Sequence, residues 1–106
     1  MSVHPYNGGG DSTVVVTQAQ IVAGNVVVRG APNRLVTVLN GGAAATAGAA
    51  LTFFDNASAA SGTVIGVVPI GLAAGGMITF NMPAAAGIVV GQQAAFTGGP
   101  LTIATY

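Results

Sequence analysis

Cysteine and lysine are both missing from this chain of 106 residues, and only 4% of the residues are charged. Without cysteine there are no disulfides, thiolate metal ligands or cysteine nucleophiles, so packing alone must hold the fold. The two basic and two acidic residues give a formal net charge of zero. Because such a chain has no long-range field to attract phosphate groups or an anionic membrane surface, we expect no nucleic-acid partner.

Residues able to perform acid–base chemistry are few. His4 is the one histidine, and it lies near the start of the chain beside Pro5 and Tyr6, where no expected strand or helix would orient it as a base. The glycine-rich segments 8–13 and 41–48 match neither common phosphate-binding motif. The sequence therefore predicts neither a histidine-dependent active site nor a phosphate-binding loop.

Asp11 and Asp55 are the two acids. A hydrolase that uses two acids would need both in one cleft, and an oxygen-rich metal site would need backbone donors as well. Asp11 follows three glycines and Asp55 leads Asn56 into an expected hairpin, positions that favour Asp because its side chain bonds nearby backbone N–H groups. We therefore predict a structural or binding protein that is not an enzyme, with no cofactor and no metal site.

Residues 63–80 carry no charge, and their length is close to the roughly 20 residues that a membrane-spanning helix needs. Pro69, the pair Gly75–Gly76 and the many β-branched residues are unfavourable for such a helix. No Lys or Arg flanks the stretch to set an orientation. We expect no membrane-spanning segment here.

Helix signals are nearly absent, because the apolar residues occur in short runs separated by many of the 17 glycines and 5 prolines. Short β-branched segments between turn residues are typical of an all-β protein. We predict a compact antiparallel β-sandwich or jelly-roll-like barrel of about eight short strands, formed by one domain over residues 12–106 after a flexible N-terminal arm over residues 1–11. The expected strands are 12–18, 21–30, 34–40, 50–56, 62–70, 77–83, 87–91 and 101–106.

Alternating side chains indicate which strand faces are buried. Ile78, Phe80 and Met82 share one face of an expected strand, and Leu101 and Ile103 share one face of the last strand. The opposite faces carry Thr, Ala and Asn rather than Lys and Glu. This composition is typical of a surface buried against another subunit, and the alternative is that these residues simply face water. Because a free monomer would lack the lysines that block pairing between strand edges, we expect obligate assembly.

Arg29 and Arg34 bracket the expected turn at residues 30–33, so we expect both at one end of the fold. Their forked donors could bind an acidic group on a partner subunit, and simple solvation is the alternative.

The segment RLVTVLNGGAAATAGAALTFFDNASAASGTVIGVVPI, with the later MITFNMPAAAGIVV and the closing LTIATY, resembles small β-sandwich virion structural proteins of tailed bacteriophages. The resemblance covers about residues 34–106. It implies a head decoration (cement) or head-fibre protein, with a small tail or neck component as the alternative. Such a protein binds the outer head shell as a symmetric oligomer and stabilises it.

The resemblance also implies partners and a location. The partners would be further copies of the chain, with a trimer favoured, and the major capsid protein or other virion proteins. The location would be the virion, with the capsid surface favoured. The N-terminal arm, with His4, Pro5 and Tyr6, would then dock on the shell or on a neighbouring copy. An adhesin domain that binds host carbohydrate and a helical membrane protein of holin type are the other classes considered.

Overall fold

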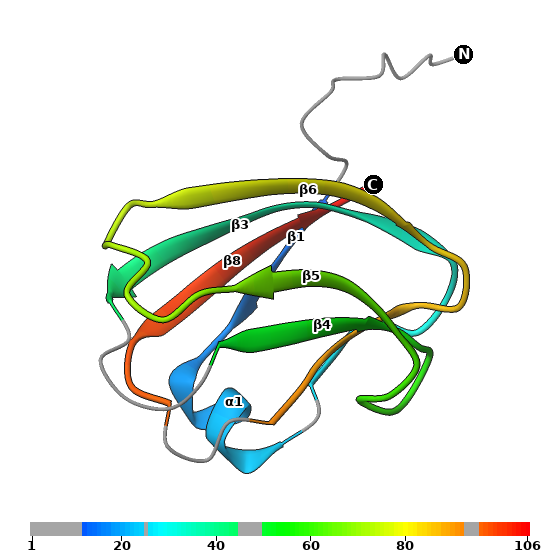
Figure 1. Cartoon of the computed structure of the whole chain (residues 1–106), viewed down its shortest axis with the longest axis horizontal. Coiled ribbons are helices and arrows are strands. Elements are labelled where there is room, and N and C mark those ends of the chain that lie inside the picture. The colour runs from blue at the N-terminus through cyan, green and yellow to red at the C-terminus, as the bar shows by residue number, and fades with distance from the viewer. Residues whose placement is uncertain (1–11, 25, 45–49, 93–95) are drawn as a thin grey trace.

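The computed structural model describes residues 12–24, 26–44, 50–92 and 96–106. These residues form two antiparallel four-stranded β-sheets that face each other, with one short helix at one end (Figure 1). The elements are β1 Ser12–Val16, α1 Gln18–Ala23, β2 Val26–Arg29, β3 Asn33–Ala43, β4 Leu51–Asp55, β5 Thr63–Val68, β6 Met77–Ala84, β7 Ile88–Val90 and β8 Gly99–Thr105. The predicted arm at 1–11 lies outside the described residues.

The strand order identifies the sandwich as a jelly roll. One sheet has the order β1-β8-β3-β6 and the other has the order β2-β7-β4-β5. Strand β1 pairs with β8, β2 with β7, β3 with β6 and β4 with β5, all antiparallel. The chain is thus one long hairpin, with β4 and β5 at its tip, that rolls up into two layers, which is the eight-stranded jelly roll. The all-β prediction is confirmed.

The core lies between the two sheets and is built mostly from inward-facing strand residues, with Ile21 of α1 and Phe96 of the β7–β8 connection. Phe53 is fully buried at its centre, and its ring centroid lies 6.1 Å from that of Phe80. Burying a Phe side chain stabilises the folded state by about 1.5–3 kcal/mol relative to leaving it exposed. The core residues are Val16, Ile21, Val28, Leu35, Val38, Leu51, Phe53, Ile65, Val68, Ala84, Ile88, Val90, Phe96, Leu101 and Ile103. The prediction for Leu101 and Ile103 is confirmed.

Helix α1 corrects the prediction that strands run through residues 12–18 and 21–30. Thr17 is its N-cap, and the Thr17 hydroxyl accepts a hydrogen bond from the Gln20 backbone N–H at 3.2 Å. The Gln20 side-chain oxygen accepts one in return from the Thr17 backbone N–H at 2.8 Å. This capping box stabilises the first turn, and burial of Ile21 anchors the helix to the core.

Strand β6 corrects the prediction that Met82 shares the buried face of Ile78 and Phe80. Ile78 and Phe80 pack against the core, but the Met82 side chain is 40% exposed. Asn81 has a positive φ of 51°, and the pairing of β3 with β6 shifts register between Leu35 and Thr37. This bulge resets the alternation of side chains.

The uncharged stretch 63–80 forms β5, the following connection and the first half of β6. Among the described residues, no helix has the length and apolar character needed to cross a membrane.

Candidate functional site

The charged side chains of the described residues gather at one end of the sandwich. Arg29 and Asp55 both lie beside Ile88 in the sheet, and Arg34 lies beside Pro83 in the other sheet. The β2–β3, β4–β5 and β6–β7 connections meet at this end, on the right in Figure 1. Arg34 also pairs there with the C-terminal Tyr106. We call this end the charged end. Arg29 and Arg34 therefore lie at the same end of the fold, as the turn between them predicted.

Asp55 ties two connections together at the charged end. One carboxylate oxygen accepts a hydrogen bond from the Ala85 N–H at 3.0 Å, and the other accepts from the Ala86 N–H at 2.8 Å and the Gly87 N–H at 3.4 Å. The hydrogen bonds from Ala86 and Ala85 hold the pKa of Asp55 below its ordinary value. The partners lie about thirty residues away along the chain, which corrects the expectation of nearby partners.

Arg29 bridges the two sheets. Its Nε donates to the Thr105 hydroxyl at 3.1 Å, its Nη1 donates to the Val28 carbonyl at 3.2 Å, and its Nη2 donates to the Ser12 hydroxyl. Ser12 and Thr105 belong to β1 and β8, whereas Arg29 ends β2 in the other sheet. Much of its donor capacity is therefore used within the chain.

Arg34 uses less of its donor capacity within the described residues. Its Nη1 donates to the backbone oxygen of Asn81 at 3.0 Å and approaches the Asn81 side-chain oxygen at 3.4 Å. Of the two arginines, Arg34 is the better placed to bind an acidic group of a partner. That either arginine contacts a partner stays a prediction.

On the outer face of the sheet β1-β8-β3-β6, the charged side chain of the described residues is Arg34, at the start of β3, and the rest of the face is uncharged. We call this surface face A. Val15 and Met77 are its most exposed apolar residues, at 54% and 61%. The strand register places on this face Thr13, Val15, Thr37, Leu39, Met77, Thr79, Thr102 and Ala104. The predicted Thr- and Ala-rich face therefore exists, and its burial against another subunit stays a prediction.

The outer face of the other sheet, face B, is also apolar. Val27, Val64 and Val67 are each nearly half exposed, at 45%, 48% and 45%. Phe54 lies between Val64 and Val89 in the register. Thus both broad surfaces of the sandwich present β-branched and aromatic side chains, and within the described ranges their charges are confined to the ends of the strands.

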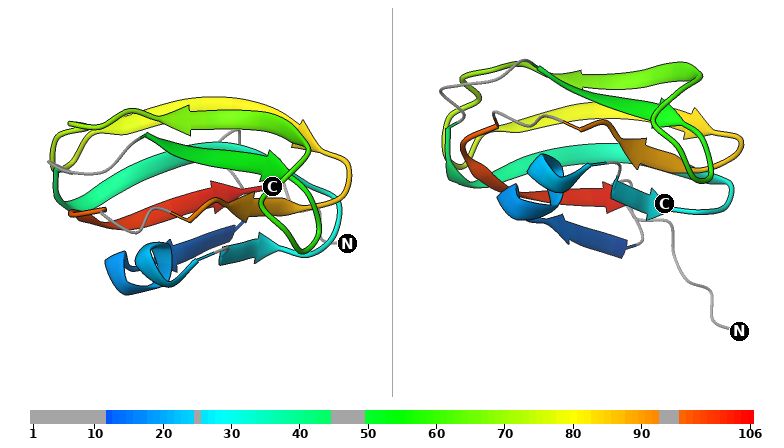
Figure 2. Two further views of the ribbon diagram at one scale, coloured as in Figure 1. Left: turned by 60° about the horizontal axis from the view of Figure 1, so that its bottom comes forward. Right: turned by 90° about the horizontal axis from the view of Figure 1, so that it is seen from below.

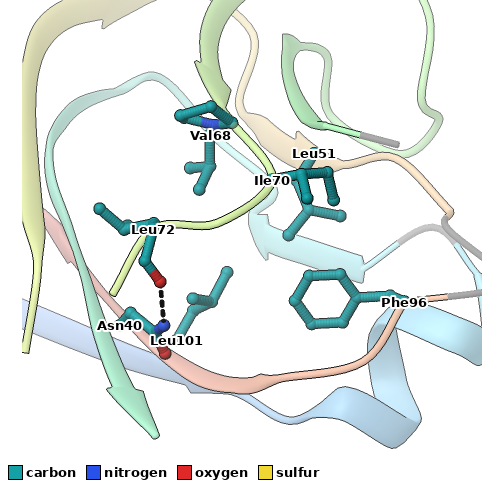
Figure 3. Close-up of a pocket in the computed structure, with 8 residues that line it drawn as sticks. Asn40, Leu51, Val68, Ile70, Leu72, Phe96 and Leu101 are labelled. Atoms are coloured by element: carbon teal, nitrogen blue, oxygen red, sulfur yellow. Dashed lines mark hydrogen bonds between the residues drawn. The ribbon is translucent and has the colours of Figure 1, made fainter. Parts of the chain in front are cut away.

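A small hollow lies at the end opposite the charged end. It is a shallow depression, open to solvent, and is lined by Asn40, Leu51, Val68, Pro69, Ile70, Leu72, Phe96 and Leu101 (Figure 3). Asn40 supplies the polar side chain of this lining. Its amide nitrogen donates to the carbonyls of Leu72 at 2.7 Å and Ala43 at 3.2 Å, and its oxygen accepts from Gly42. These bonds occupy the Asn40 amide, and the other lining residues are apolar.

Three of the predicted contact residues, His4, Pro5 and Tyr6, lie outside the described residues. Among the described residues no group of three or more His, Cys, Asp or Glu side chains could hold a metal ion. Sequence reasoning did not single out Val15, Val27, Val64 or Val67. The signal was present in the uncharged valine runs of their strands.

Comparison of the chain with protein-family models, curated proteins and solved structures found no match. The resemblance to phage virion proteins therefore stays a prediction.

Proposed function

We propose that this chain is a structural virion protein of a tailed bacteriophage, most consistent with a head decoration protein that binds the outer shell together with further copies of itself. The observation that carries the proposal is the chemistry of faces A and B. Two broad surfaces whose charged side chains, in the described part of the chain, are confined to the strand ends suit association through apolar contact, where few ions need to lose their hydration.

Two further features support the proposal. The resemblance of residues 34–106 implies a virion protein, and the jelly roll is a fold that viral capsid proteins use. Lectins use this fold too, so the fold by itself does not assign a function. At the charged end, Asp55 accepts hydrogen bonds from the β6–β7 connection and Arg29 donates to Thr105 of the other sheet. Such cross-links suit a protein that must keep its shape on a shell.

The test is the location and copy number of the chain in purified phage particles, measured by quantitative mass spectrometry and electron microscopy. We expect a copy number comparable with that of the major shell protein and density on the outer head. A copy number far below that of the shell protein would instead assign the chain to the tail, neck or fibre. Absence of the chain from particles would overturn the virion assignment.

The second test is self-association of the purified chain, measured by size-exclusion chromatography with light scattering. A mass that rises with concentration toward a closed oligomer supports the proposal. A strict monomer at the highest reachable concentration contradicts the self-association part.

A further inference from the structure

Strand β1 differs from the other edge strands of the two sheets. The sheets end in β1 and β6 on one layer and in β2 and β5 on the other. An edge strand leaves a row of unpaired N–H and C=O groups, and proteins commonly protect such edges with bulges, prolines, charged side chains or short length. The protection of each edge can be judged from the strand registers.

Three of the four described edges are interrupted. The register of β2 shifts between Val27 and Arg29, and the strand ends on a charged residue. The register of β5 shifts opposite Phe53 and Phe54. Strand β6 contains the bulge at Asn81 and also Pro83. Each of these edges is therefore a poor template for a further strand.

Strand β1 has none of these interruptions. Its register with β8 runs without a shift from Ser12 opposite Thr105 to Val16 opposite Leu101. Its sequence, STVVV, has no charge and no proline, and four of its five residues are β-branched, which favours pairing. In the right-hand view of Figure 2, β1 lies at the lower rim of its sheet, and no other described strand pairs with its outer side.

The hydrogen bonds of β8 show which groups of β1 point outward. Arg34 and Tyr106 exchange two backbone hydrogen bonds, of 3.1 and 3.0 Å. The backbone groups of Tyr106 therefore point toward β3, and those of Thr105 point to the other side, toward β1. By alternation Ile103 and Leu101 also point toward β1.

The residues of β1 that pair with these three are Ser12, Val14 and Val16. Thr13 and Val15 then direct their N–H and C=O groups away from the sheet. The side chain of Val15 is also 54% exposed on face A. Among the described residues, the outer edge of β1 thus offers two donors and two acceptors beside an apolar surface.

We propose that β1 pairs antiparallel with β1 of a second copy of this chain across a two-fold axis. If this axis is perpendicular to the sheet, face A of both copies lies on the same side of the joined sheet. Residues that pair across the axis must therefore point to the same face. The arrangement centred on Val14 aligns all five residues, and arrangements shifted by one pair align fewer. It places Thr13 opposite Val15 of the second copy, which makes two hydrogen-bonded pairs and leaves Val14 opposite Val14 as a non-hydrogen-bonded pair.

The second copy is the occupant that the chemistry of this edge favours. The five paired positions hold hydroxyl and valine side chains, so self-pairing brings no like charges together. Pairing would also join two copies of face A into one continuous, largely uncharged surface. This contact rests on the self-association in the proposed function, and β1 is the surface through which the copies would associate. An isologous two-fold contact is distinct from a three-fold one, so it would link neighbouring oligomers.

The pairing is weak in solution and becomes strong in an array. A five-residue edge buries well below the roughly 800 Å2 per partner of a standard interface. Copies held side by side on a shell gain from a high effective concentration, which converts a weak contact into a stable one.

The absence of cysteine makes single-cysteine variants a direct test. Cα atoms in a non-hydrogen-bonded pair are about 4.5 Å apart, a distance that a disulfide can bridge. We expect Val14→Cys to form a disulfide-linked dimer under mild oxidation. Val64→Cys, on the interrupted edge β5, is the control, because Val64 is 48% exposed and random collision would favour it. Val14→Cys should cross-link at least about tenfold faster, since paired thiols have a high effective concentration.

Val15→Pro tests the hydrogen bonds. Proline removes an outward N–H that β8 does not use, so the fold should persist, which circular dichroism would check. Adding Val15→Pro should reduce cross-linking of Val14→Cys to the rate of the Val64→Cys control. Retention of the faster rate would overturn the pairing.

Two other results also contradict the proposal. If Val14→Cys links no faster than Val64→Cys while the unmodified chain self-associates, β1 pairing fails and the proposed function stands. If Val14→Cys links only after residues 1–11 are removed, the edge is occupied by the chain's own N-terminal segment rather than by a second copy.

Discussion

Gly87 is a position where the structure leaves no room for a side chain. It lies in the β6–β7 connection at the charged end, and a Cβ added there would lie 2.4 Å from the Arg29 carbonyl oxygen and 2.7 Å from that of Asn56. It would also lie 3.1 Å from the Ala57 Cα. These neighbours are main-chain atoms, so no side-chain rotation can relieve the clash.

We therefore expect Gly87→Ala to destabilise the fold strongly. Extra methyl groups in packed regions commonly cost about 1–3 kcal/mol, and the lack of any movable neighbour puts this substitution at about 3 kcal/mol or more. Displacement of the connection would also weaken the three hydrogen bonds to Asp55. For a domain of this size, a loss of about 3 kcal/mol lowers Tm by roughly 12–24 °C.

Gly30→Ala is the matched control at the same end of the fold. Its added Cβ would lie 3.7 Å from the Ala57 carbonyl oxygen and 3.9 Å from Val27 Cγ1, which are ordinary contacts. Because alanine also restricts the unfolded chain, we expect a change between zero and about 1 kcal/mol of stabilisation.

The assay is urea unfolding followed by circular dichroism, with the slope of each transition checked against the unmodified chain. A free energy of unfolding for Gly87→Ala within about 1 kcal/mol of the unmodified chain would refute the close approach of the three segments. Equal losses for both variants would refute the specific role of the space at Gly87.

Two further predictions concern Asp55 and Thr17. The pKa of Asp55 is lowered in the folded protein. The contribution of Asp55 to the free energy of unfolding is therefore fully present above the ordinary pKa of 3.8 and is lost as pH falls through the folded pKa. In urea unfolding at a series of pH values, the free energy of unfolding of Asp55→Asn should fall less steeply in acid than that of the unmodified chain. Asp11→Asn is the control, and an unchanged acid slope in Asp55→Asn would contradict the clamp. Thr17→Ala removes the helix cap and should cost about 1 kcal/mol in thermal melts, whereas equal stability to the unmodified chain would show that the capping box contributes nothing.

Much of the fold was readable in the chain because the signals were local. Short β-branched runs between turn residues predicted the strands, and alternation predicted the buried side of Phe80 and of Ile103. The helix was missed even though Thr17 and Gln20 stand at the spacing of a capping box, since six residues are too few for a helical period. Met82 was misplaced because a bulge resets alternation, and the positive φ of Asn81 depends on pairing with β3.

Some features of the candidate surfaces were also predicted from the sequence, and others were not. The scarcity of charge predicted uncharged sheet faces, and the turn between Arg29 and Arg34 predicted one charged end. No local pattern indicated that Asp55 would bond the backbone of residues 85–87, because that contact joins segments about thirty residues apart.

The sequence by itself therefore determined the all-β class, the approximate strands and the uncharged character of their surfaces, because each follows from side chains close together in the chain. Only the tertiary structure decided the jelly-roll order, the bridge from Arg29 to Thr105 and the position of β1 as an edge strand with an unshifted register among the described strands. These depend on which strands become neighbours, and that choice is made by burying the whole core at once rather than by any one segment.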